Sequence, residues 1–275
     1  MEPIEDRAVL ITGATDGLGR ATAHELASHG ASVLVHGRSR ERGEATVGEL
    51  RAAAGDERAH LHLADLSSLA EVRRLAAEVE AAHERLDVLV NNAGMIAGER
   101  ELSDDGYELT FAVNYLSHFL LTELLRPLLV RSAPARIVNV ASIGQSPIDF
   151  DDVMLERGYS DFRAYGQSKL AQIMFSFELA ERLGGEGEEG VSVNALHPAT
   201  LMETKMVRDH LRRARSTVSA GVQALTRLAV SDEVEGMTGR FYDGVGESRA
   251  DPQAYDPEAR RRLWELSEEL TGTGR

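Results

Sequence analysis

The chain has 275 residues, a mass of 30.0 kDa, a formal net charge of −15 and a pI near 5.1. Such an acidic surface repels the phosphates of nucleic acids and anionic lipids, so we expect neither nucleic acid nor membrane as a partner. The chain has no cysteine, which excludes disulfides and a thiol nucleophile. Its first residues are acidic and show no signal-peptide pattern, so the cytoplasm is the expected location.

The first predicted element is a strand at Ala8–Ile11, a short apolar run typical of a strand buried on both faces. A glycine-rich segment follows, and a helical pattern continues to about His29. This order is the context of a dinucleotide-phosphate site, because glycine lets the backbone approach the pyrophosphate and a helix N-terminus favours its charge. A purely structural turn is the alternative. The candidate cofactor-binding residues are Thr12, Gly13, Thr15, Asp16, Gly17, Leu18 and Gly19.

The second predicted strand, Ser32–His36, is followed by Gly37 and Arg38. In dinucleotide-binding folds an acid at this position favours NAD, whereas an arginine accommodates the 2′-phosphate of NADP. Arg38 therefore favours NADP(H), and Arg20 and Arg42 are possible further contacts of the 2′-phosphate. NAD(H) stays open as the alternative, because the carboxylate of Asp16 would repel that phosphate.

The next two strands also end in residues suited to a ligand crevice. A helix near 40–54 leads to a strand at Ala59–Ala64, and a helix near 68–85 leads to a strand at Leu86–Val90. Asp65 can accept a hydrogen bond from an adenine amino group, or cap the following helix, or do both. These strand ends add Asp65, Leu66, Asn92, Ala93 and Gly94 to the expected cofactor site.

An apolar segment at Tyr107–Val130 predicts a buried helix that contains one amide, Asn114. A buried amide needs hydrogen-bond partners, so Asn114 is either a packing residue or part of a site. The fifth strand, Ile137–Ala141, ends at Ser142, which is a site residue or a strand-end cap.

Tyr165 and Lys169 lie four residues apart at the start of a predicted helix that runs to Leu183, so both side chains lie on one helix face. A nearby cation lowers the pKa of a phenol, which makes the pair a plausible general acid/base unit. Only two of the 30 cationic residues are lysines, so a lysine here indicates a place where a guanidinium does not fit. A solvated helix face with a chance pair is the alternative.

The sixth strand, Val191–Leu196, precedes Pro198 and Thr200. The region near 200–215 is predicted to form a partly helical substrate cover, with Met202, Met206 and Val207 on one side. A helix near 217–230, a short strand at 240–243 and a closing helix at 258–270 complete the chain. Strands alternate with helices throughout, which predicts an α/β fold: a single domain, residues 1–275, with a doubly wound, mostly parallel Rossmann-type sheet.

Taken together, the glycine-rich turn, Asn91–Gly94, Asn114, Ser142 and the pair Tyr165 and Lys169 resemble the short-chain dehydrogenase/reductase family. The segments 165–180 and 262–272 resemble the branch that holds retinol dehydrogenases and the WW-domain oxidoreductase. Two features depart from the family pattern. Ala199 replaces the usual glycine after Pro198, so either Thr200 or Thr204 takes the family threonine's place near the nicotinamide carboxamide. The loop at 143–164 is long and is expected to shape the substrate mouth through Pro147, Ile148, Phe150 and Tyr159.

The resemblance implies an NADP(H)-dependent oxidoreductase that moves a hydride between a nicotinamide and an alcohol or carbonyl, without a metal. It implies that Tyr165 is the general acid/base, and that Lys169 hydrogen-bonds the nicotinamide ribose and lowers the pKa of the phenol. It also implies that Ser142 hydrogen-bonds the substrate oxygen and that Asn114 holds a water molecule of a proton relay. Homodimers or homotetramers built on the helices at 107–130 and 165–183 are expected. A non-catalytic nucleotide sensor or scaffold is the alternative. An apolar small molecule is the expected substrate, from Met95, Ile96, Ile148, Met202 and Met206.

Overall fold

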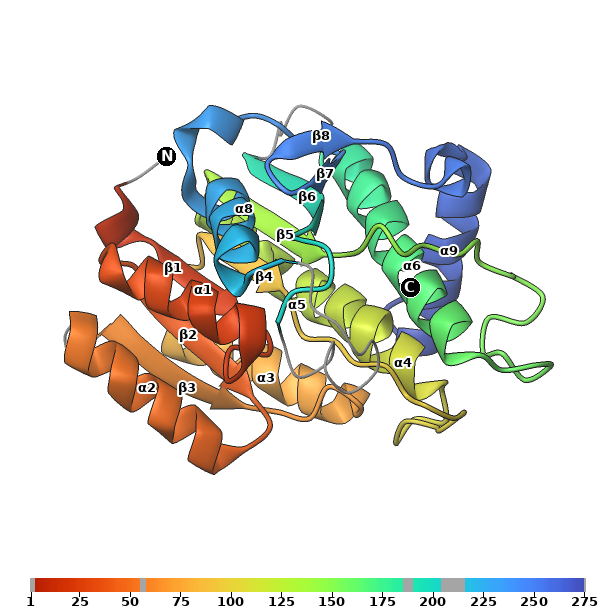
Figure 1. The fold of residues 1–275 in the computed structure, drawn as a ribbon, viewed down its shortest axis with the longest axis horizontal. Coiled ribbons are helices and arrows are strands. Elements are labelled where there is room, and N and C mark those ends of the chain that lie inside the picture. Colours follow the sequence, from red (N-terminus) through yellow and green to blue (C-terminus); the bar gives the residue numbers. More distant parts are fainter. Residues whose placement is uncertain (1–2, 55–57, 185–189, 204–215, 275) are drawn as a thin grey trace.

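A computed structural model describes residues 3–54, 58–184, 190–203 and 216–274. Its centre is one eight-stranded sheet in the order β3-β2-β1-β4-β5-β6-β7-β8, shown in Figure 1. All neighbouring strands are parallel except β7 and β8, which are antiparallel. The strands are β1 (Ala8–Ile11), β2 (Ser32–Gly37), β3 (Ala59–Leu63), β4 (Val88–Asn91), β5 (Ala135–Val140), β6 (Val191–His197), β7 (Arg240–Asp243) and β8 (Gly246–Ser248).

The strand order reverses between β1 and β4, because β2 and β3 extend one way from β1 and β4 to β7 extend the other. In doubly wound sheets ligands bind at such a switch point, outside the carboxyl ends of the strands. The predicted α/β fold is confirmed. The sequence pattern missed β8, a three-residue strand that follows a tight turn after β7.

Helices cover both faces of this sheet. The helices are α1 (Gly17–Ser28), α2 (Arg40–Ala54), α3 (Leu69–Ala82), α4 (Leu109–Phe111), α5 (Ser117–Arg131), α6 (Asp161–Arg182), α8 (Val218–Val230) and α9 (Pro257–Thr271). Two apolar clusters define the layers: one contains side chains of α1, α2 and α8, and the other contains side chains of α3, α5, α6 and α9.

Strand β1 shows why its apolar run is continuous. Successive side chains of a strand point to opposite faces, and here both faces are covered. Ala8 and Leu10 belong to the α3/α5/α6 cluster, whereas Val9 and Ile11 belong to the α1/α2/α8 cluster. All four residues are buried, so each contributes to a core.

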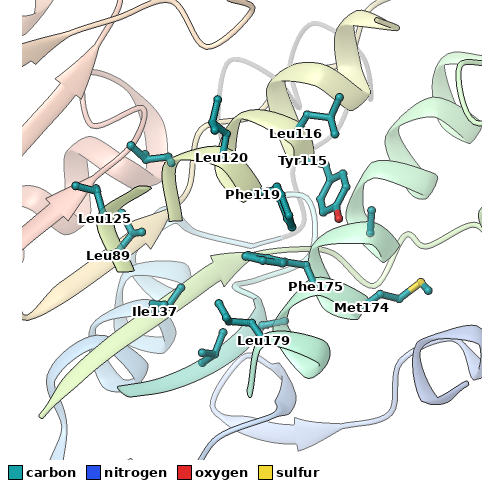
Figure 2. Close-up of a cluster of buried hydrophobic side chains, with 14 of the residues drawn as sticks. Leu89, Tyr115, Leu116, Phe119, Leu120, Leu125, Ile137, Met174, Phe175 and Leu179 are labelled. Atoms are coloured by element: carbon teal, nitrogen blue, oxygen red, sulfur yellow. The ribbon is translucent and has the colours of Figure 1, made fainter. Parts of the chain in front are cut away.

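The core beneath α5 and α6 is where the aromatic residues gather. Figure 2 shows Phe119 and Tyr115 from the α5 side facing Phe175 from α6, above Ile137 of β5. The rings of Phe119 and Phe175 are 5.4 Å apart in an edge-to-face arrangement. Such aromatic pairs add about 0.5–1.5 kcal/mol beyond their buried area. The two helices are therefore fixed against each other and against the sheet.

The predicted helix at 107–130 begins at Leu109 and is interrupted by a π-helical turn, η3 (Ala112–Leu116). The buried carboxylate of Glu108 starts it by accepting hydrogen bonds from the backbone N–H groups of Thr110 (2.9 Å) and Phe111 (2.7 Å). Asn114 is the central residue of the π turn. Single π turns inside α-helices frequently occur at functional sites.

The C-terminal helix α9 packs against α6, as Figure 1 shows. Trp264 lies with its ring centroid 5.1 Å from that of Phe119 and 5.9 Å from that of Phe175, under the guanidinium of Arg182 at 4.1 Å. The buried Arg260 forms ion pairs with Glu178 and Glu181 of α6, and the Tyr115 hydroxyl hydrogen-bonds Ser267 Oγ at 2.7 Å.

This packing changes the expectation for assembly. Residues 166–180 of α6 are all buried within the chain, and most of α5 is buried as well. The surface expected to carry a subunit interface is therefore largely covered by the chain itself.

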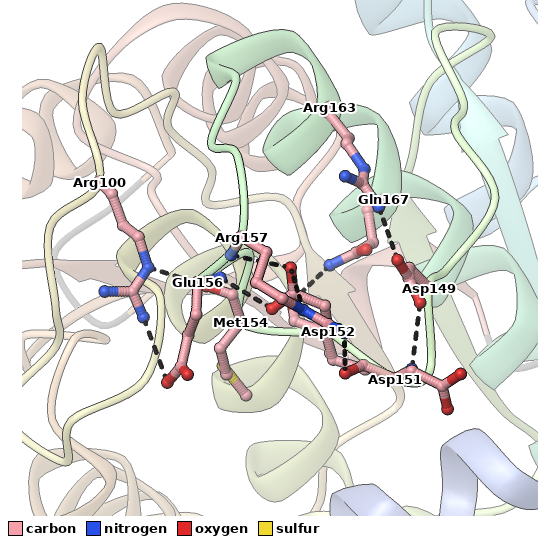
Figure 3. A network of polar contacts seen from close by, with 10 residues as sticks. Arg100, Asp149, Asp151, Asp152, Met154, Glu156, Arg157, Arg163 and Gln167 are labelled. Atoms are coloured by element: carbon pink, nitrogen blue, oxygen red, sulfur yellow. Dashed lines mark hydrogen bonds and ion pairs between the residues drawn. The ribbon is translucent and has the colours of Figure 1, made fainter.

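The loop at 143–160 is held by its own polar contacts, which Figure 3 shows. The carboxylate of Asp152 accepts hydrogen bonds from the backbone N–H groups of Glu156 (2.8 Å) and Arg157 (3.0 Å). Arg163 of α6 pairs with Asp149 at 3.0 Å, and Gln167 donates to the Val153 carbonyl at 2.7 Å. The loop is therefore fastened to α6 from outside the cleft.

The prediction that four residues of this loop shape the substrate mouth is wrong for the described structure. Ile148 is buried and its backbone N–H donates to Gln253 at 2.7 Å. Phe150 lies under the Arg262 guanidinium at 4.8 Å. Neither of these two residues, nor Pro147 or Tyr159, lines the cleft described below. The loop packs toward the C-terminal region because its apolar side chains find partners there.

None of the described helices is long and apolar enough to cross a lipid bilayer.

Candidate active site

A cleft of about 780 Å³ opens at the carboxyl ends of the strands, at the switch point between β1 and β4. Its walls come from segments far apart in the sequence. One wall is the glycine-rich turn with the ends of β2 and β3, and the other is the end of β4, the end of β5 and α6. Of the predicted site residues, those lining it are Gly13, Thr15, Asp16, Gly17, Leu18, Gly19, Arg38, Asp65, Leu66, Asn92, Ala93, Gly94, Tyr165, Lys169 and Pro198.

The glycine-rich turn needs its glycines for space and for backbone conformation. Gly13 has a φ of +67°, in the left-handed region that favours glycine. At Gly19 a Cβ atom would lie 2.4 Å from the Gly13 carbonyl oxygen and 2.5 Å from Asn92 Nδ2. These distances leave no room for any other residue. Helix α1 begins at Gly17, so its N-terminal N–H groups point at the cleft, as a phosphate site requires.

Thr12 is predicted as a cofactor residue, but the structure places it beneath the turn. Its side chain is fully buried, and its hydroxyl oxygen accepts hydrogen bonds from the backbone N–H groups of Asn92 and Ala93, both at 2.9 Å. Asn92 Nδ2 donates to the Thr12 carbonyl oxygen at 2.8 Å. Thr12 therefore joins the ends of β1 and β4 and sets the shape of the turn from below.

His36, a buried histidine near the end of β2, is a site residue that was not predicted from the sequence. The Gly13 N–H donates to His36 Nδ1 at 3.2 Å, so Nε2 carries the proton and faces the Ala64 carbonyl oxygen at 3.2 Å. Burial lowers the pKa of His36 to about 4, so the ring is neutral at pH 7. Its position at the end of a strand beside the glycine-rich turn was the signal that could have identified it.

The ribose end of the cleft carries two exposed arginines. Arg42 pairs with Asp16 at 2.7 Å, which neutralises the carboxylate that argued against a 2′-phosphate. Asp16 also accepts the Gly17 N–H at 2.7 Å and so caps α1. Arg38 lines the cleft beside Asp65 and helps to lower that carboxyl's pKa. Arg20 pairs with Glu49 and does not line the cleft.

Asp65 forms a local turn and does not cap α3. Its Oδ1 atom accepts the backbone N–H of Ser67 at 2.9 Å and the Ser67 hydroxyl at 2.7 Å. Burial opposes ionisation of Asp65, but these hydrogen bonds and the nearby Arg38 and His36 outweigh it and lower its pKa. The residue that precedes α3 at its N-terminus is Ser68.

Tyr165 lines the opposite wall of the cleft, whereas Ser142 is buried near it and does not line the cleft. Tyr165 lies in the second turn of α6, and the Ser142 hydroxyl from the end of β5 lies near enough to the phenol to influence its pKa. Burial raises the pKa of Tyr165 above its ordinary value, and the nearby Ser142 hydroxyl opposes this. Lys169 was expected to lower the pKa of the phenol. In the protein without bound nucleotide the pKa is instead raised.

Lys169 does face Tyr165, but through the ring: Nζ lies 5.6 Å from the ring centroid. The ammonium is buried and donates hydrogen bonds to the Val140 carbonyl oxygen and to Gln172 Oε1, both at 2.8 Å. Burial lowers the pKa of Lys169 to about 7. A lysine with this pKa exists in both protonation states near neutral pH, and can hold or release a proton there.

Asn114 is close to these residues, and both polar atoms of its side chain already form hydrogen bonds within the protein. Its Oδ1 accepts the Met95 N–H at 2.8 Å, and its Nδ2 donates to the Met95 carbonyl oxygen and to Ser168 Oγ, both at 3.0 Å. The side chain therefore fixes the segment after β4 against α6. Its backbone carbonyl oxygen lies 3.0 Å from His118 Nδ1.

Beyond β6, Pro198 lines the cleft, whereas Thr200 does not. The Thr200 hydroxyl lies 3.1 Å from His197 Nε2. Met202 lines the cleft, and Leu201 beside it has a φ of +50°, which is uncommon for a branched residue. The predicted cover near 200–215 lies mostly outside the described residues, as do Thr204, Met206 and Val207.

Groups of three or more histidine, aspartate or glutamate side chains that could hold a metal ion are absent from the described residues. The glycine cradle, the helix N-terminus and the arginines fit a dinucleotide instead. Gly94 lies beside two polar groups, since a Cβ there would be in van der Waals contact with Asn114 Oδ1 at 3.4 Å and with Lys169 Nζ at 3.6 Å. The fold and the cleft thus define a Rossmann-type oxidoreductase.

Comparison with known families agrees with this class. The family model for short chain dehydrogenases matches residues 7–214. The chain therefore belongs to the short-chain dehydrogenase family, in a branch that resembles the retinol dehydrogenases, and is an oxidoreductase.

Curated relatives of similar length support that placement. Human retinol dehydrogenase 14 is 40% identical, over 97% of this chain and 86% of its own length. Human retinol dehydrogenase 13 is 38% identical, over 98% of this chain and 86% of its own length. Mouse polyprenol dehydrogenase is 36% identical, over 100% of this chain and 86% of its own length.

Solved structures show the same fold. A protein of uncharacterised function from Mycobacterium paratuberculosis superposes with a TM-score of 0.79 and 33% identity, over 97% of this chain and 94% of that chain. The complex of Pseudomonas aeruginosa RhlG with NADP superposes with a TM-score of 0.70 and 29% identity, over 88% of this chain and 97% of that chain.

Proposed function

We propose that this chain is an NADP(H)-dependent oxidoreductase that interconverts an alcohol and a carbonyl of an apolar substrate. The observation that carries the proposal is the position of the Tyr165 hydroxyl. Tyr165 lines a cleft whose opposite wall is the glycine-rich turn, and Ser142 lies near its hydroxyl. A nucleotide on the turn and a substrate at the phenol would share one space.

The residues of the chain have distinct roles in this proposal. When bound, the nicotinamide supplies or accepts the hydride. Tyr165 donates its phenolic proton to the substrate oxygen in reduction and accepts it back in oxidation. Because burial raises the phenol's pKa, Tyr165 is protonated at pH 7 in the protein alone, which suits proton donation. Ser142 stabilises the charge that develops on the same oxygen.

Lys169 and the segment after β4 bind the nicotinamide ribose in this proposal. The side chain of Asn114 holds that segment through Met95 and ties it to Ser168 of α6. The relay water at Asn114 stays a prediction. So does the contact between a threonine and the nicotinamide carboxamide, since the Thr200 hydroxyl lies beside His197.

The preference for NADP(H) rests on charge at the ribose end. Arg38 is exposed at the cleft, and Asp16 is already paired with Arg42. A 2′-phosphate placed there meets two guanidinium groups, whereas an unmodified ribose gains little from them. The complex of the related RhlG contains NADP.

The preference for an apolar substrate rests on the lining of the cleft. Its apolar side chains include Met95, Ile96, Leu109, Val113, Phe162, Leu201 and Met202. The names of the similar curated proteins refer to retinol and polyprenol, both apolar alcohols. Location in the cytoplasm stays a prediction. So does a homo-oligomer, which would have to use surfaces other than the faces of α5 and α6 that the chain already covers.

The decisive experiment is a titration with NADPH and with NADH, followed by a panel of carbonyls and alcohols read at the nicotinamide absorbance. We expect tighter binding of NADPH and turnover of apolar members of the panel. Binding without turnover of any member would favour the sensor alternative. Failure to bind either nucleotide would contradict the proposal.

A further inference from the structure

The amine of Lys169 is held from two sides that do not face the cleft. Its Nζ atom donates to the Val140 carbonyl oxygen and to Gln172 Oε1, both at 2.8 Å. A nitrogen with three substituent hydrogens is tetrahedral, and two directed hydrogen bonds therefore determine where its remaining position points. Lys169 lines the cleft, and Gly94 lies next to Nζ on that side.

Gln172 is fully buried and its orientation is determined by its partner. The lysine amine directs its N–H groups outward, so the amide oxygen of Gln172, and not its nitrogen, must face Nζ. The amide nitrogen then lies 3.3 Å from Nδ1 of His118.

His118 is itself held by Thr12. The two lone pairs of the Thr12 hydroxyl accept N–H groups of Asn92 and Ala93, so its proton has two acceptors in reach: His118 Nε2 at 3.1 Å and, at a longer 3.4 Å, the Val90 carbonyl oxygen. His118 Nδ1 then carries the ring proton and donates to the Asn114 carbonyl oxygen at 3.0 Å. Burial lowers the pKa of His118 to about 3, which keeps this tautomer neutral.

We propose that Gln172 is a positioning residue for Lys169: with the Val140 carbonyl it holds two N–H groups of Nζ, so that only the cleft-facing position of the amine gains or loses a proton. The charged amine then presents an N–H group to the cleft, and the neutral amine presents a lone pair in the same place. The proton on Nζ is thereby directed at the nicotinamide ribose and away from the protein interior.

The chain offers a direct test, because it contains only two lysines, Lys169 and Lys205. In a Lys205→Arg background, NMR of protein labelled at the lysine Cε reports the titration of Lys169 alone. The nucleotide-free protein is expected to titrate near pH 7. Gln172→Met removes an acceptor that favours the charged amine, and should lower the midpoint by about one pH unit. Gln172→Glu keeps the shape, adds a negative charge and should raise the midpoint by about one unit or more.

Gln167→Met is the matched control. Gln167 is also a fully buried glutamine of α6, but it donates to the Val153 carbonyl at 2.7 Å and does not contact Lys169. We expect no shift of the midpoint. Unchanged titration in both Gln172 variants, or equal shifts in Gln167→Met and Gln172→Met, would overturn the proposal. If Gln172→Met does not fold, the upward shift in Gln172→Glu still decides the question.

The role in catalysis rests on the proposed function, and a kinetic measurement separates the two. In each Gln172 variant, the pH profile of kcat should move in the same direction as the titration midpoint of Lys169. A loss of protein stability alone would not cause such a shift. A wild-type chain without turnover would contradict the proposed function, while the NMR titration would still test the positioning of the amine. If the Lys169 midpoint shifts in the Gln172 variants but the pH profile of kcat does not, a role for Gln172 in the reaction would be contradicted.

Discussion

The two walls of the cleft are built differently. The glycine-rich turn is held mainly by contacts to backbone atoms, as in the bonds from Asn92 and to His36, and by exposed ion pairs such as that of Asp16 with Arg42. The wall that carries Tyr165 and Lys169 is held by buried side chains that bond one another across α5, α6 and the sheet.

The register of β4 and β5 shows this second pattern well. Asn91 and Asn139 face each other on neighbouring strands, with Asn91 Nδ2 donating to Asn139 Oδ1 at 2.8 Å. Asn91 also donates to Thr122 of α5 at 2.9 Å, and Asn139 donates to Ser176 of α6 at 2.8 Å. The comparison teaches that one wall depends on local backbone shape, whereas the other depends on a buried network in which the loss of one side chain leaves its partner without a hydrogen bond.

The largest expected effect is at the acid/base wall. Tyr165→Phe removes only the phenolic oxygen, so we expect turnover to fall by about 10²–10⁴-fold while NADPH binding changes by no more than several-fold. Steady-state rates and a nucleotide titration on the same protein check both parts. Retained turnover would remove Tyr165 from the acid/base role.

The second effect tests the support behind that wall. Trp264→Ala removes a buried ring that packs on Phe119 and Phe175, and should lower the free energy of unfolding by about 3–5 kcal/mol. Urea unfolding measures the loss. Leu102→Ala, at a side chain that is 53% exposed, is the control and should change stability by no more than about 0.5 kcal/mol. Equal effects would show that α9 does not stabilise the wall.

The third effect is a pH dependence at the turn. The folded pKa of His36, about 4, is below the ordinary value of 6.5, so the unfolded chain binds a proton there first. The stability that the neutral ring contributes is therefore complete above pH 6.5 and is lost as pH falls toward 4. At pH 5 the loss is about 2 kcal/mol.

His36→Asn removes the titrating group while its side-chain oxygen can still accept the Gly13 N–H. The loss of stability between pH 7 and pH 5, measured by urea unfolding, should be smaller in the variant by about 2 kcal/mol. Because the carboxylates titrate in both proteins, their contribution cancels in the difference. An identical loss in both proteins would mean that His36 is not the buried neutral group described.

The smallest effect is at the exposed ribose end. Arg38→Asp should shift the ratio of NADP to NAD preference by about tenfold, since it replaces attraction of a phosphate by repulsion in a solvated place. Arg20→Asp is the control, because Arg20 is also exposed but does not line the cleft. Kinetics with both nucleotides measure the ratio, and equal shifts in the two variants would assign the effect to net charge alone.

The helix that carries the acid/base pair shows how far sequence reasoning reaches. The spacing of Tyr165 and Lys169 placed both on one face of a helix, and the structure confirms that they face one cleft. The same reasoning did not find Gln172 or His118. Their contact joins residues 54 positions apart, and nothing in the local pattern of either segment indicates the other.

The sequence by itself determined the succession of strands β1 to β7 and of the long helices between them, the glycine-rich turn and the helix face of the acid/base pair, because each depends on neighbours within a few residues. Tertiary structure decided that Thr12 lies under the turn, that α9 covers α5 and α6, and that burial raises the pKa of the phenol and lowers that of the lysine. The physical reason is that solvation and hydrogen-bond partners depend on which distant segments pack together, and these are properties of the folded chain alone.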